Sequence, residues 1–219
     1  MIASFNRARE RGAALVTALL VAALLAGLGA VVITITITET LIAAAHRHSA
    51  EAAYAADAAF ERALTDLVSV PDWSVVVLPA PANVQSTFVD GQARPLAPDG
   101  RPLDVAALTR ARQTESDAKY GPAVFGADAP RWRLFAQSPL SGVVPPGTPV
   151  QPAYVFVWVA DDGLDGDGDP ALDANGRLLV FAEAYGTGGA RRAVEAAVAR
   201  SPAGTLNVVS WRGTPSRLQ

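Results

Sequence analysis

The densest group of potential metal ligands is an aspartate-rich segment, residues 161–176, with the sequence DDGLDGDGDPALDANG. Small residues separate its carboxylates, so that Asp165, Asp167 and Asp169 follow one another at every second position, and Asp173 comes after them. Carboxylates at this spacing converge on a hard cation such as calcium, which binds oxygen ligands. The segment is therefore a candidate calcium site.

The spacing is only partly that of an EF-hand loop. Four carboxylates match positions 1, 3, 5 and 9, but Pro170 replaces the glycine of position 6 and Gly176 replaces the bidentate glutamate of position 12. Asp161, Asp162 or a loop carbonyl would complete a different cage. The candidate ligands are Asp161, Asp165, Asp167, Asp169 and Asp173. The alternative is a solvated turn between strands, in which the carboxylates repel one another and leave the loop mobile.

The sequence offers no comparable support for catalysis. The only histidines, His46 and His48, face different directions on a helix, and no serine, histidine and acid constellation forms around them. The chain has no cysteine, which excludes a disulfide, a thiolate zinc site and a cysteine nucleophile. The net charge is −3 without a basic run, so we expect no nucleic-acid partner. We predict a protein that is not an enzyme.

The N-terminal part of the chain is typical of a membrane-spanning helix. Residues 13–38 contain no charged side chain, and a span needs roughly 20 such residues. Three arginines and one glutamate precede them, which predicts that residues 1–12 stay in the cytoplasm and the rest is exported. The apolar stretch is longer than the roughly 7–15 residues of a cleavable secretory signal. We therefore expect a single-pass membrane protein.

The same helix is predicted to continue well beyond the membrane. All 16 prolines lie at or after Pro71, and alanine-rich sequence extends to Leu67, which predicts a helix from Ala13 to about Val68, roughly 80 Å long. The valines, isoleucines and threonines after Gly27 and Gly29 alternate as in a strand, but an open strand would leave its backbone unsatisfied in a bilayer. These threonines either bond back to the helix or mark a region that melts when the chain leaves the bilayer.

One face of the helix beyond the membrane is predicted to dock on the domain that follows. Its apolar residues are spaced i, i+4, i+7, and acidic residues between them are expected to face solvent. The docking residues are Phe60, Leu64 and Leu67, and the solvent-facing residues are Asp57, Glu61 and Asp66.

The remainder of the chain is predicted to be rich in strands. Six segments are rich in β-branched and aromatic residues and bounded by Gly or Pro. They are residues 73–78, 131–137, 153–160, 177–185, 190–199 and 205–211. GTGG at 186–189 lacks the lysine of a phosphate loop and is typical of an antiparallel hairpin, in which pairing of Tyr185 with Ala190 places Glu183 opposite Arg192.

Two further features are expected in this part of the chain. Asp104 is a candidate N-cap for a short helix that ends near Tyr120. The proline-rich stretches 79–102 and 138–152 are predicted to be surface loops.

The N-terminal sequence also resembles a known family. The run RERGAALVTALLVAALLAGLG is similar to a type IV prepilin leader, and ETLIAAAHRHSAEAAYAADAAFERAL resembles its continuation in PilX-like minor pilins. The resemblance implies that a prepilin peptidase cuts between Gly12 and Ala13 and that Ala13 becomes the mature, N-methylated terminus. It implies a subunit held in the bacterial inner membrane before assembly, which later packs against other pilins in the pilus or at the cell surface.

The resemblance also implies a fold and a division of the chain. The fold class is α+β and pilin-like, a long N-terminal helix with a C-terminal antiparallel β-sheet domain. The expected parts are a leader at 1–12, a transmembrane part of the helix at 13–38, an exported half at 39–70, and a β-rich exported domain at 71–219.

One departure from the family refines the expectation. Major pilins carry a glutamate at the fifth mature position, where this chain has Thr17. A carboxylate in hydrocarbon is costly unless it is paired, so Thr17 favours a priming, tip or low-abundance subunit. The alternatives are a K-type pseudopilin of a type II secretion system and a single-pass membrane-anchored binding protein.

Overall fold

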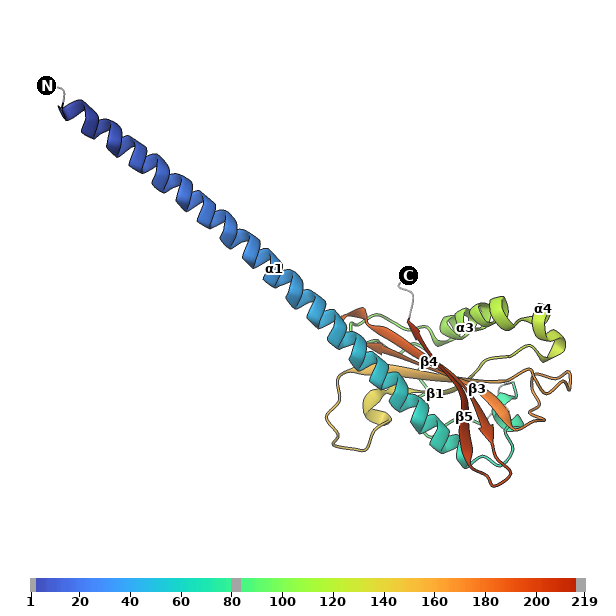
Figure 1. Cartoon of the computed structure of the whole chain (residues 1–219). Coiled ribbons are helices and arrows are strands. Elements are labelled where there is room, and N and C mark those ends of the chain that lie inside the picture. The colour runs from blue at the N-terminus through green and yellow to red at the C-terminus, as the bar shows by residue number, and fades with distance from the viewer. Residues whose placement is uncertain (1–2, 80–83, 216–219) are drawn as a thin grey trace. The chain divides into compact units, whose positions relative to one another are not determined.

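The computed structural model describes residues 3–79 and 84–215, shown as ribbons in Figure 1. The chain divides into two units, Met1–His46 and Arg47–Gln219, and each is described by itself. The helices are α1 (Ala3–Val68), α2 (Ser74–Val77), α3 (Val105–Tyr120) and α4 (Pro122–Phe125), with 3-10 turns η1 (Gly126–Asp128), η2 (Leu140–Gly142) and η3 (Thr187–Gly189). The strands are β1 (Arg133–Pro139), β2 (Ala153–Asp161), β3 (Arg177–Gly186), β4 (Arg191–Arg200) and β5 (Leu206–Pro215). The side chains of residues 1–12, including the predicted leader arginines, lie outside the described part.

The predicted fold class is confirmed, because a long N-terminal helix precedes a C-terminal antiparallel sheet. In the first unit, α1 is helical through the glycines and the alternating threonines. The hydroxyls of Thr34, Thr36 and Thr38 each donate to the backbone carbonyl four residues earlier, at 2.9, 3.0 and 2.9 Å. The first interpretation of these threonines is thus confirmed, and melting outside the bilayer stays a prediction.

The second unit contains one sheet whose five strands follow chain order, β1-β2-β3-β4-β5, all antiparallel. Alternate residues of β2 belong to different apolar clusters, because successive side chains of a strand point to opposite faces. One cluster contains Phe60 and Leu67 of α1, as predicted, with Leu64 partly buried at its margin. The other lies beneath α3, around Trp158 and Phe181. The sheet is therefore covered by a helix on each face.

The first predicted strand, residues 73–78, is wrong, because this segment contains the single helical turn α2. The indole N–H of Trp73 donates to the carbonyl of Leu67 at 3.1 Å and fixes the turn to the end of α1. Val76 and Val77 both enter the core shared with α1. A strand would direct these neighbouring valines to opposite sides, so packing overrides their β propensity.

The GTGG segment joins β3 to β4 as predicted, but the predicted register is wrong by one residue. Glu183 lies opposite Ala193 and not opposite Arg192. The three residues of η3 form a turn and do not pair between the strands, and Tyr185 consequently pairs with Arg191 instead of Ala190. Glu183 forms its ion pair with the diagonal neighbour Arg191, at 2.5 Å between Oε1 and Nε.

Asp66 does not face solvent freely, contrary to the prediction. Its carboxylate accepts hydrogen bonds from the backbone N–H and the hydroxyl of Thr87, both at 2.8 Å, and from the hydroxyl of Ser86. These residues belong to the 79–102 stretch, predicted as a surface loop, yet Phe88 is buried in the core. Asp66 therefore attaches this segment to α1.

The predicted short helix is confirmed as α3. The Asp104 side chain accepts a hydrogen bond from the N–H of Ala107 at 2.8 Å, which makes it the N-cap.

Candidate functional site

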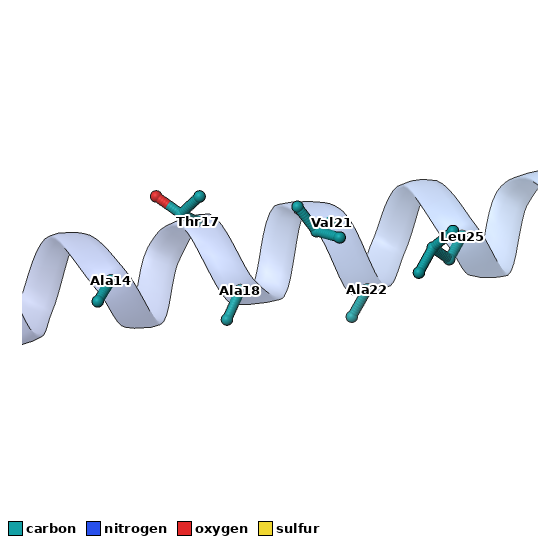
Figure 2. A pocket seen from close by; sticks show the side chains of 6 residues that line it. All are labelled: Ala14, Thr17, Ala18, Val21, Ala22 and Leu25. Carbon is teal, nitrogen blue, oxygen red and sulfur yellow. The ribbon is translucent and has the colours of Figure 1, made fainter.

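The first candidate site is the surface of α1 within the first unit. Residues 13–38 are uncharged and mostly aliphatic, yet every side chain among them is exposed. Figure 2 shows Ala14, Ala18 and Ala22 in a row along one side, beside Thr17 and Val21. A helix that is apolar on all sides belongs in a protein core or a membrane. By length and composition α1 qualifies to cross a membrane, and its row of small residues lets another helix approach closely.

Thr17 is a polar residue beside this row of alanines. Its hydroxyl donates to the carbonyl of Ala13 at 2.9 Å, so it is satisfied within its own helix. A carboxylate here would need a partner to be tolerated in hydrocarbon. Because Thr17 is uncharged and its hydroxyl is already hydrogen-bonded, it needs no charged partner from another chain.

The second candidate site is the acidic loop between β2 and β3. Asp161 is the last residue of β2 and pairs with Leu178 of β3. At the other end of the loop, the carboxylate of Asp173 accepts hydrogen bonds from the N–H groups of Gly176 and Arg177, at 2.8 and 3.1 Å. Strand pairing therefore orders the first end of the loop, and hydrogen bonds from backbone N–H groups to the Asp173 carboxylate order the second end.

Two groups of carboxylates gather in this loop, and Asp165 belongs to both. Oxygen atoms of Asp161, Asp162 and Asp165 lie within 4.8 Å of one another, and these residues are named the inner group. The outer group consists of Asp128, Asp165 and Asp167, whose oxygens also lie within 4.8 Å of one another. The inner group is the more buried of the two. Each group thus contains two of the five candidate ligands from the sequence, Asp161 and Asp165 in the inner group and Asp165 and Asp167 in the outer group.

The other two candidate ligands, Asp169 and Asp173, lie outside both groups. Asp169 is exposed and accepts a hydrogen bond from the N–H of Ala171 at 3.0 Å. Asp173 accepts its hydrogen bonds from backbone N–H groups at the end of the loop. Asp128 was missed by sequence reasoning. It lies in η1, far from the loop in the chain, and no motif or spacing connects the two.

Gly163 permits the approach of η1 to the loop. Its φ is +67°, and a Cβ atom at this position would lie 2.6 Å from the carbonyl oxygen of Asp128. Only glycine satisfies both the positive φ and the close backbone approach without strain. A glycine at position 163 is thus the signal in the sequence that could have indicated close packing of this loop. It could not have indicated that the loop packs against Asp128.

Asp161 has the most perturbed environment in the loop. It is 0% exposed, and no hydrogen bond of acceptable geometry reaches either carboxylate oxygen from the residues that the structure describes. Burial raises the pKa of Asp161 to about 8, reinforced by the charges of Asp165, Asp162 and Asp173, and the backbone N–H of Asp162 offsets only part of this. Asp161 is therefore a buried acid whose charged form needs a partner.

Asp162 is better satisfied than Asp161. It forms an ion pair with Arg177, 3.1 Å between Oδ2 and Nε, and Oδ1 accepts hydrogen bonds from the N–H of Leu164 and the amide of Asn175. Of the three carboxylates of the inner group, Asp162 is thus the one that forms an ion pair with Arg177. All these candidate ligand atoms are carboxylate oxygens, which suit hard cations rather than zinc or copper.

No known protein family, curated protein or solved structure matches this chain. Its function is therefore inferred from these two sites.

Proposed function

We propose that this protein is a minor pilin that takes part in type IV pilus assembly as a priming, tip or low-abundance subunit. The observation that carries the proposal is α1, one helix of 66 residues with two kinds of surface. Its first part is apolar on all sides, and its second part forms a core with a β-sheet. Such a helix suits a subunit that waits in a membrane and later joins others by helix packing.

The membrane stage follows from the charges beside the apolar stretch. Arginines at positions 7, 9 and 11 keep the N-terminus in the cytoplasm, so the sheet domain is exported across the inner membrane. A prepilin peptidase cuts between Gly12 and Ala13 and removes the charged segment. The apolar helix then leaves the bilayer to pack against other pilins, and the exported domain reaches the pilus surface.

Thr17 supports a minor rather than a major role. Because its hydroxyl is satisfied by the Ala13 carbonyl, the helix lacks the acidic group that would pair with the terminal amine of a neighbouring pilin. A subunit at the tip, or one that primes assembly, has fewer such neighbours to satisfy. The small residues of Figure 2 still allow close helix packing.

The leader is tested by determining the N-terminus of the protein from cells with and without active prepilin peptidase. We expect N-methylated Ala13 with the peptidase and an uncut leader without it. A Gly12→Val variant should stay uncut in both strains. The matched control is Gly29→Val, at a glycine of the same helix where an added Cβ atom would have open space within 4 Å, and this variant should be cut normally. An uncut wild-type leader in the active strain would remove the assignment.

A K-type pseudopilin of a type II secretion system is the second candidate, because Thr17 and the apolar helix suit it equally. Deletion of the gene separates the two functions. Loss of pili with intact secretion supports the minor pilin, whereas loss of secretion with intact pili supports the pseudopilin. Detection of the protein in sheared filaments by mass spectrometry gives an independent check of pilus incorporation.

A further inference from the structure

We propose that the inner group, Asp161, Asp162 and Asp165, binds a calcium ion at the end of β2. The site is independent of the assignment as a pilin, since it rests on the exported sheet unit alone.

The first observation is the unsatisfied oxygen atoms. Both oxygens of Asp161 and Oδ1 of Asp165 are buried and accept no hydrogen bond from the described residues. Asp161 is 0% exposed and faces the other two carboxylates of the group. Buried polar atoms nearly always have a partner, and a buried carboxylate is costly unless it is paired or binds a metal. A cation placed among these oxygens supplies that partner.

The second observation is the size of the group. Calcium binds oxygen at about 2.3–2.6 Å, so two oxygens on opposite sides of one ion lie roughly 5 Å apart. The three carboxylates of the inner group offer oxygens within 4.8 Å of one another. They therefore fit around a single ion without rearrangement of the backbone.

The charge balance also favours a divalent cation. Arg177 forms an ion pair with Asp162, 3.1 Å between Nε and Oδ2, and the described ion pairs place no other arginine or lysine on the inner group. If all three carboxylates are ionised, this single positive charge therefore compensates only part of their negative charge. Asp128 and Asp167 of the outer group add further negative potential beside Asp165. A monovalent cation would leave much of this charge uncompensated.

The donor set and the loop geometry select the ion. Carboxylate oxygens alone do not favour zinc, which prefers nitrogen and sulfur ligands. Magnesium demands a near-ideal octahedron, whereas calcium accepts irregular ligand arrangements. Asp161 lies at the end of a strand, and Asp165 lies in the irregular loop that follows. This irregular arrangement of ligands suits calcium better than magnesium. Asp162 also lines a cavity of about 190 Å³, which brings solvent ions to the edge of the group.

The decisive experiment is a calorimetric titration of the full chain in detergent micelles with calcium chloride, after removal of bound metal with a chelator. We expect saturable binding of one calcium ion, weaker binding of magnesium, and a rise in the thermal midpoint of the sheet unit with calcium. Tryptophan fluorescence reports the unfolding of that unit.

Two variants with the same loss of charge make the test specific. Asp161→Asn should weaken calcium binding about tenfold or more, because it removes a ligand charge. Asp169→Asn is the matched control, since Asp169 lies in the same loop but outside both groups, and it should bind calcium as the wild type does. Asp165→Asn gives a second ligand variant if Asp161→Asn does not fold.

In chelator, Asp161→Asn should be at least as stable as the wild type, because it replaces a buried acid, whose ionised form has no partner, by a neutral side chain of similar size. This readout separates a ligand from a residue needed only for folding. The proposal is overturned by folded wild-type protein without saturable binding at millimolar calcium. It is also overturned if Asp161→Asn and Asp169→Asn bind calcium equally well.

Discussion

Replacement of Asp66 by asparagine tests how the segment after α2 is held to the long helix. The Asp66 side chain is 11% exposed and accepts three hydrogen bonds from Ser86 and Thr87. Hydrogen bonds to a charged group contribute about 1.5–3 kcal/mol. All three hydrogen bonds reach the same oxygen, Oδ2. Asparagine can keep its carbonyl oxygen there, but only as a neutral acceptor, and it then places its NH₂ group toward Arg62. We therefore expect Asp66→Asn to lower the free energy of unfolding by about 2 kcal/mol.

The ionised state of Asp66 adds a pH dependence. Burial raises its pKa, but hydrogen bonds from Ser86 and Thr87 and the charge of Arg62 outweigh burial and bring the pKa below its ordinary value. The folded-state pKa thus lies below the unfolded value of about 3.9. The contribution of the carboxylate is fully present above the unfolded pKa and is lost as the pH falls through the folded pKa. The difference between wild type and variant should shrink below about pH 4.

The assay is urea unfolding of the full chain in non-ionic micelles, followed by tryptophan fluorescence from pH 7 to pH 3. Trp73 reports locally, because its indole donates to the carbonyl of Leu67, next to Asp66. Asp57→Asn is the control, since it removes the same charge from the same helix, and burial raises the pKa of Asp57. It should be neutral or slightly stabilising. Equal destabilisation by both variants would refute the specific role of Asp66.

Three further substitutions test the sheet unit by the same urea titration. Phe60→Ala should cost about 3–5 kcal/mol, because Phe60 is fully buried and contacts the edge of the Trp211 ring; a loss below about 1 kcal/mol would contradict this core. Arg200→Lys should cost about 1–2 kcal/mol, since the guanidinium donates to three carbonyls at the end of α1 and stacks 4.4 Å from Trp73, which an ammonium cannot match. Gly163→Ala should lower the free energy of unfolding by about 1–3 kcal/mol, because the residue has a positive φ. It should also weaken calcium binding. Unchanged stability would mean that η1 does not approach the loop closely.

Local patterns in the sequence predicted the elements that depend on local chemistry. The end of α1 at Val68 follows from the proline-free, alanine-rich sequence before Pro71, and the start of α3 follows from the capping residue Asp104. The strands β1 to β5 follow from their β-branched and aromatic residues between glycines and prolines. In each case, the residues that specify the element lie within it or beside it.

The register error between β3 and β4 is local, since the turn η3 causes it. Two other wrong predictions share a different cause, which is packing against residues outside the segment considered. Residues 73–78 have strand propensity but contain a helical turn, because Trp73, Val76 and Val77 fill the core at the end of α1. Asp66 looked like a solvent-facing residue because its helical position was judged without Thr87, its partner 21 residues later. Propensity and periodicity contain no information about such partners.

The acidic loop shows the same limit for a binding site. The spacing of the aspartates identified Asp165 and Asp167, because metal-ligand spacing is a local property, and Asp161 was added as a nearby carboxylate that completes a cage. The spacing gave equal weight to Asp169, which lies outside both groups, and could not include Asp128, which η1 supplies. What distinguishes Asp161 from Asp169 is burial, since one is the last residue of a central strand and the other is exposed at the loop tip.

The two parts of α1 differ in how their surface is satisfied, and this difference links the fold to the proposed function. In the second unit, one face of the helix is covered by its own sheet, so a substitution such as Phe60→Ala acts on the stability of the single chain. In the first unit, no described residue of the chain covers residues 13–38. Lipid or helix packing with other chains would remove this apolar surface from water. Substitution of Ala18 by a larger apolar residue should therefore leave the urea titration unchanged and reduce incorporation into filaments, and a loss of stability instead would place a partner for this face within the chain.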